Sequence, residues 1–174
     1  MEVTIIMTTG QLEEKLKSGA ASNPDPAERL RFAAEELALF FEVRPHEVGI
    51  FKVNPNKHEI VFIWPQGMTG YGHIPLNAIN SLVAKTANDR TAALDNSFAG
   101  SRHLFIFEHM LAEKSDRIPL QKIMSAPIIK GDEVLGVLQI SRKAPTVTEA
   151  GADFTSQDLD NLKAISTMIA NYIA

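Results

Sequence analysis

Two apolar segments joined by a short turn decide the fold of this chain. The first is Ile123-Met-Ser-Ala-Pro-Ile-Ile129, the turn is Lys130-Gly131-Asp132-Glu133, and the second is Val134-Leu-Gly-Val-Leu-Gln-Ile140. Gly131 can adopt the positive φ that a tight hairpin turn requires, and aspartate also tolerates this conformation. The pattern therefore predicts a β-hairpin near the C-terminus.

The two segments are apolar at consecutive positions instead of alternating with polar residues. A strand with this pattern is buried on both faces of its sheet. We therefore expect helices on one face and a second covering layer on the other. The second layer is the expected location of function.

The sequence predicts two capped amphipathic helices, one before the strands of this sheet and one after them. Asp25 caps the first, which runs from Pro26 to about Glu42. Thr155 caps the last, and Asp158 at its third position completes a capping box.

The segment between these helices is predicted from turn signals and periodicity. We expect a hairpin over 47–64, a glycine-rich loop over 65–75, a helix over 77–86 and a short strand over 91–94. Residues 101–113 fit a helix or a strand equally well.

Short motifs continue from the hairpin to the end of the chain. They are Ala126-Pro127, Gly131-Asp132, Val134 to Leu138, Arg142-Lys143, Phe154-Thr155 and Asp158-Leu159, followed by Leu162 and Ile169. In this order they resemble the GAF domain, a small-molecule sensor module of phosphodiesterases, adenylyl cyclases, phytochromes and many bacterial regulators.

The resemblance implies an α+β fold with a roughly five- to six-stranded antiparallel sheet at its centre. The N-terminal (26–42) and C-terminal (156–173) helices lie on one face. Residues 65–119 form a helix-and-loop cover over the other face and could enclose a pocket. The first and last long strands are expected to be neighbours. We assign residues 1–25 to an N-terminal extension with a short helix and 26–174 to the domain.

Family members that bind cyclic nucleotides share an Asn-Lys, Phe and Asp-Glu signature. Lys143, Phe154 and Asp158 match it, whereas Arg142 and Leu159 depart from it. The resemblance thus gives little support to cyclic-nucleotide binding. It implies that Lys143 and Asp158 form a structural latch beside a packing residue, Phe154; ligand contact is the alternative role for the pair.

Aromatic and histidine side chains are frequent in the expected cover. Rings with polar tips among apolar side chains are typical of a small-molecule pocket. The candidate ligand-binding residues are Trp64, Tyr71, His73, Phe98, His103, Phe105 and Phe107. The alternative is that these rings fill the space and leave no cavity.

The apolar stripes of the two flanking helices are wider than one sheet face requires. This width favours a homodimer in which the helices of two copies pack together. The candidate dimer-face residues are Leu30, Leu37, Phe41, Leu162, Ile165, Ile169 and Tyr172.

Composition argues against several classes of protein. A net charge of −4 without a basic run argues against nucleic-acid binding. No apolar stretch approaches about 18 residues, and no secretory leader is recognisable, so we expect a cytoplasmic protein that does not span a membrane.

The sequence also lacks the usual signs of catalysis. It has no cysteine, which excludes disulfides, thiolate metal sites and a catalytic thiol. The related free-methionine-sulfoxide reductases and bilin-bearing phytochrome domains depend on cysteine. The five histidines show no metal-ligand spacing. We therefore expect no enzyme activity, no metal and no cofactor.

The function expected from the sequence is a non-catalytic, small-molecule-sensing regulatory domain of a signalling system. An unidentified ligand would bind beneath the cover and change the helix pair of a dimer. The alternative is a pocketless dimerisation or protein-interaction module that acts on a signalling partner protein.

Overall fold

The computed structural model describes residues 6–68, 73–115 and 117–173 of the chain. The helices are α1 (Thr9–Ser22), α2 (Pro26–Phe41), α3 (Leu82–Asp89), α4 (Ile106–Ser115) and α5 (Ser156–Ile173). The strands are β1 (Val48–Asn54), β2 (Glu59–Trp64), β3 (His73–Pro75), β4 (Ala93–Asp95), β5 (Leu120–Lys130) and β6 (Glu133–Lys143). Short 3-10 helices are η1 (Pro45–Glu47), η2 (Gln66–Met68) and η3 (Phe98–Ser101).

The strands form one antiparallel sheet in the order β3-β2-β1-β6-β5-β4. The first and last long strands, β1 and β6, are neighbours at its centre, as predicted. Gly131 makes the predicted turn between β5 and β6 with a φ of 61°. Gly136 permits close contact between β6 and β1, because a Cβ there would collide with the carbonyl oxygen of Phe51.

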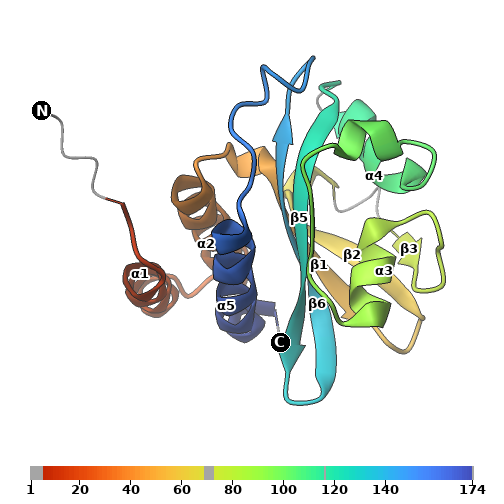
Figure 1. Ribbon diagram of the computed structural model, residues 1–174. Coiled ribbons are helices and arrows are strands. Elements are labelled where there is room, and N and C mark those ends of the chain that lie inside the picture. The colour runs from red at the N-terminus through yellow and green to blue at the C-terminus, as the bar shows by residue number, and fades with distance from the viewer. Residues whose placement is uncertain (1–5, 69–72, 116, 174) are drawn as a thin grey trace, which may run out of the picture.

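Helices α2 and α5 cover one face of the sheet, and α1 packs on their outer side (Figure 1). The core on this face is apolar and fully buried, with Leu37, Met124, Leu138 and Ile169 each 0% exposed. No helix in the described part of the chain is long and apolar enough to cross a membrane.

The predicted starts of α2 and α5 are confirmed. Asp25 Oδ1 accepts a hydrogen bond from Ala27 N. At α5, Thr155 Oγ1 accepts from Asp158 N, and Asp158 Oδ2 accepts from Thr155 N in return. This reciprocal pair satisfies donors that would otherwise have no partner at the helix start.

Helices α3 and α4 cover the opposite face of the sheet (Figure 1). The helix predicted over 77–86 begins later, because Ala78 N bonds Pro75 O in a turn and Ser81 caps α3. The ambiguous segment 101–113 becomes helical from Ile106.

Candidate ligand-binding site

A cavity of about 280 Å³ lies between the sheet and its cover. The floor comes from the cover-facing side of β1, β2, β5 and β6, and the roof comes from α4 and the segment around η2. Its apolar lining includes Phe51, Phe62, Met68, Leu111, Leu120 and Ile123. A concave, largely apolar space with a few polar groups is typical of a small-molecule site.

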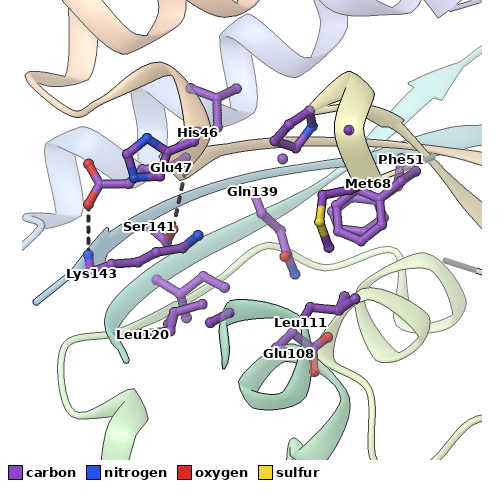
Figure 2. Close-up of a pocket in the computed structure, with 17 residues that line it drawn as sticks. His46, Glu47, Phe51, Met68, Glu108, Leu111, Leu120, Gln139, Ser141 and Lys143 are labelled. Atoms are coloured by element: carbon purple, nitrogen blue, oxygen red, sulfur yellow. Dashed lines mark hydrogen bonds between the residues drawn. The ribbon is translucent and has the colours of Figure 1, made fainter. Parts of the chain in front are cut away.

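Gln139 projects from β6 toward α4 and supplies a polar group to the floor of the cavity (Figure 2). Its Nε2 donates to Ser125 Oγ at 3.2 Å. Ser125 Oγ also lies 2.8 Å from Thr86 Oγ1 on α3. All three side chains are at most 6% exposed, so the chain of hydrogen bonds is shielded from solvent.

A second polar group closes one end of the cavity. Glu47 Oε1 accepts from Lys143 N and from Arg44 Nη2, each at 2.7 Å, and Glu47 Oε2 accepts from Arg44 N. Burial alone would raise the pKa of Glu47, but these hydrogen bonds outweigh it and hold the pKa below its ordinary value. Ser141 Oγ donates to Glu47 O at 3.2 Å (Figure 2).

Arg142 joins this end of the cavity to the helices on the other face. Its guanidinium group donates to Phe41 O and Glu42 O at the end of α2. The same group lies 4.7 Å from the centre of the Phe154 ring, just before α5. Arg142 of β6 therefore contacts both the end of α2 and the residue Phe154 that precedes α5.

Glu108 links the two cover helices. Its Oε1 accepts from Val83 N at 2.8 Å and from Ser81 Oγ at 3.2 Å at the start of α3. Its Oε2 is buried and has no hydrogen-bond partner among the described residues. Burial raises the pKa of Glu108 to about 7, although the hydrogen bonds act in the opposite direction. This carboxyl group therefore changes charge near neutral pH.

An aromatic cluster packs beside the cavity. The Phe98 ring stacks on Phe105 at 5.5 Å and on His109 at 4.7 Å between ring centres. Burial, and next the charge of Arg102, lower the pKa of His109, which favours its neutral form. Phe98 is 0% exposed, so this cluster is closed packing.

The structure places the predicted ligand-binding residues that it describes outside the cavity lining. Tyr71 lies outside the described residues. Trp64 belongs to the helix-side core and donates to Pro45 O at 3.0 Å. His73 is exposed beside Glu59, with 3.1 Å between Nδ1 and Oε2. Phe98 and Phe105 lie in the aromatic cluster, and His103 is exposed. Phe107 is partly buried against the core between the sheet and the cover.

The structure does not bring the two residues of the predicted latch together. Among the described residues, the side chain of Asp158 contacts only its cap partner Thr155. The ion pair that ties the loop before α5 to the sheet is instead Lys122–Asp153, at 2.7 Å. Phe154 is 3% exposed and belongs to the helix-side core, which is a packing role.

The candidate dimer-face residues lie mostly inside the protomer. Leu37, Phe41, Leu162, Ile165 and Ile169 are at most 5% exposed in the helix-side core, and Leu30 and Tyr172 are partly buried against it. Their wide stripe is explained by contacts with the sheet, with each other and with α1. Leu39 on α2, which is 65% exposed, is more open to a second copy than the five buried side chains.

The sequence contained a signal for the polar cavity residues that was missed. Gln139 and Ser141 are polar residues two positions apart in an apolar strand. Side chains at this spacing point to the same face, so both belong to the covered side of the sheet. Buried polar positions of this kind mark either internal hydrogen bonds or a site.

Comparison with known proteins identifies the family. The family model for the GAF domain matches residues 25–173, so the chain belongs to the GAF domain family. GAF domains are generally regulatory or sensor domains. No curated protein sequence matches the chain.

Solved structures with low sequence identity share this fold. A GAF domain of a Coxiella burnetii phosphoenolpyruvate-protein phosphotransferase has a TM-score of 0.72 at 14% identity, over 98% of this chain and 95% of that one. The corresponding Acinetobacter domain has a TM-score of 0.67 at 15% identity, over 96% and 94%. A Neisseria meningitidis free methionine-R-sulfoxide reductase, solved with its substrate, has a TM-score of 0.66 at 15% identity, over 99% and 92%.

Proposed function

We propose that this domain is a non-catalytic regulatory domain that binds a small molecule in the cavity and reports its occupancy through α2 and α5. The observation that supports the proposal most directly is the position of residues 139–143 of β6. Gln139, Ser141 and Lys143 line the cavity. Arg142, on the same strand, contacts the end of α2 and Phe154, which lies just before α5.

A ligand can change the helices only if it binds one arrangement of them better than another. Movement of the strand end by a ligand would alter the distances from Arg142 to the carbonyl oxygens of α2 and to the ring of Phe154. These contacts are few and specific, so a small displacement would change their energy.

Catalysis by a thiol is poorly supported, although a methionine-R-sulfoxide reductase shares the fold. This sequence has no cysteine to act as a nucleophile. No group of three or more His, Asp or Glu in the described ranges could hold a metal ion. A homodimer that transmits the signal remains a prediction, and light scattering can test whether the dimer forms.

The proposed function is tested in two stages. A thermal-shift screen of metabolites first identifies a compound that stabilises the protein. Addition of that compound should then change the rate of backbone amide hydrogen exchange at the cavity and also at residues 41–44 and 154–158. Arg142→Lys keeps the charge but cannot make the same set of contacts, so it should retain binding and lose the change at the helix ends.

Two results would count against the proposal. Stabilisation by no compound would favour the alternative function, a protein-interaction module. Binding with changes confined to the cavity would mean that occupancy is not transmitted to the helices.

A further inference from the structure

Gln139 uses only part of its hydrogen-bonding capacity within the described protein. Its amide nitrogen is engaged by Ser125, whereas Oε1 accepts no hydrogen bond from the described residues. This oxygen is not one of the fully buried polar atoms that lack a partner, and the side chain borders the cavity (Figure 2). An amide oxygen that faces a cavity is an available acceptor for a ligand N–H or O–H group.

The surroundings of Ser125 hold this amide in place. Ser125 is 0% exposed, and its hydroxyl lies between Gln139 Nε2 and Thr86 Oγ1. Rotation of Gln139 away from this position would break a buried hydrogen bond, which is costly. The amide oxygen is therefore presented in a fixed position before any ligand arrives.

The carboxylate oxygens around the cavity are either hydrogen-bonded within the protein or fully buried in it. Both oxygens of Glu47 accept hydrogen bonds from Arg44 or Lys143. Glu108 directs Oε1 to the start of α3, and its Oε2, which has no hydrogen-bond partner among the described residues, is fully buried. Because an isolated charge is costly to bury, the part of a ligand that lies among Phe51, Phe62 and Leu111 should be uncharged.

The cavity volume indicates the size of the ligand portion that it can hold. An apolar cavity of about 150 Å³ holds a benzene molecule. At about 280 Å³, this cavity has nearly twice that volume. Its size therefore fits a molecule of about two fused rings.

We propose that Gln139 is the specificity-determining residue of this cavity and that its ligands are uncharged, largely apolar molecules of about two fused rings that donate a hydrogen bond to Gln139 Oε1. This inference rests on the proposed function in one respect, namely that the cavity is the ligand site.

The test compares indole, which has an N–H donor, with 1-methylindole, which has none, by calorimetric titration. The wild type should bind indole about two- to tenfold more tightly, as expected for one neutral hydrogen bond. Gln139→Leu should abolish this preference, and Gln139→Met is the substitute if the first variant does not fold. Ser125→Ala should reduce the preference, because it releases the amide. Gln157→Leu, an exposed change on α5, is the matched control and should leave both affinities unchanged.

The outcomes separate this inference from the proposed function. Equal binding of the two probes by the wild type, or an indole preference that survives in Gln139→Leu, would overturn the role of Gln139 and leave the cavity as a ligand site. Failure of both probes to bind would overturn the inferred ligand class. The broader compound screen would then decide the proposed function independently.

Discussion

The two faces of the sheet are built from the same strands but differ in what they bury. Toward α2 and α5, the central strands present Met124, Ala126 and Leu138, all fully buried in an apolar core. Toward α3 and α4, the alternate positions present polar side chains, including Ser125 and Gln139. A cavity of about 280 Å³ lies on this second face.

This difference suggests that the two faces contribute differently to stability. Close packing on the helix face gains apolar burial and dispersion contacts at every position. The cover face loses some of these contacts at the cavity and contains buried polar atoms, such as Glu108 Oε2, that have no hydrogen-bond partner among the described residues. Such atoms destabilise a fold unless something binds them or a proton neutralises them. We therefore expect mutations on the two faces to have different effects.

The largest effect is expected from truncation on the helix face. Leu162→Ala removes a side chain that is 0% exposed and should lower the free energy of unfolding by about 2–5 kcal/mol. Leu111→Ala removes the same atoms from the cavity roof, where contacts are already incomplete, and should cost less, about 2 kcal/mol at the lower end of this range. Urea denaturation of both variants measures the difference. Equal losses would mean that the two faces are equally well packed.

The next largest effect is a pH dependence that originates on the cover face. The pKa of Glu108 is raised from 4.5 to about 7, so the folded protein binds this proton more tightly than the unfolded chain does. Its contribution to stability is complete below about pH 4.5 and is lost as the pH rises through about 7, by about 3 kcal/mol at most. Glu108→Gln, which cannot ionise, should lack this loss.

Urea denaturation at pH 5 and pH 8 tests this expectation when the wild type is compared with Glu108→Gln. The lowered pKa of His109 acts in the opposite sense, because stability rises as the unfolded-state histidine loses its proton. That contribution is present in both proteins and cancels in the comparison. The same pH dependence in both proteins would exclude Glu108 as the source.

A smaller effect is expected at the connection between the two faces. Arg142→Ala removes two hydrogen bonds to the end of α2 and the contact with Phe154, and should cost about 1–3 kcal/mol. Hydrogen exchange should become faster at the end of α2 and the start of α5. Unchanged exchange there would show that Arg142 does not couple the strand to the helices.

The smallest effect is expected at the edge of the helix face. Asp153→Ala removes an ion pair whose acidic side chain is 70% exposed, and should cost about 0–1 kcal/mol. Lys122 is buried and also donates to Gly151 O at 2.6 Å, so Lys122→Ala should cost more. Thermal unfolding of the two variants gives the ranking. A larger loss of stability for Asp153→Ala than for Lys122→Ala would contradict this ranking.

The sequence predicted the helix face better than the cover. Capping residues at Asp25 and Thr155 located the starts of α2 and α5, because caps act over three or four residues. The start of α3 was predicted too early, at Asn77. Ser81 is the actual cap, and local sequence does not distinguish between two capping residues so close together.

None of the predicted ligand-binding residues that the structure describes lines the cavity. Aromatic side chains suggested a pocket, yet Phe98 and Phe105 pack against each other and Trp64 faces the helix core. Residue type alone does not reveal on which side of the sheet an aromatic ring lies. The polar pair Gln139 and Ser141 was the better indication.

The sequence by itself determined the hairpin, the two capped helices and the burial of both sheet faces, because these depend on periodicity and on hydrogen bonds between near neighbours. Only the tertiary structure decided where the cavity lies and which residues line it. That cavity depends on how closely α4 and η2 approach strands distant from them in the chain. The distance between such layers is set by the packing of many side chains together, and no local pattern contains it.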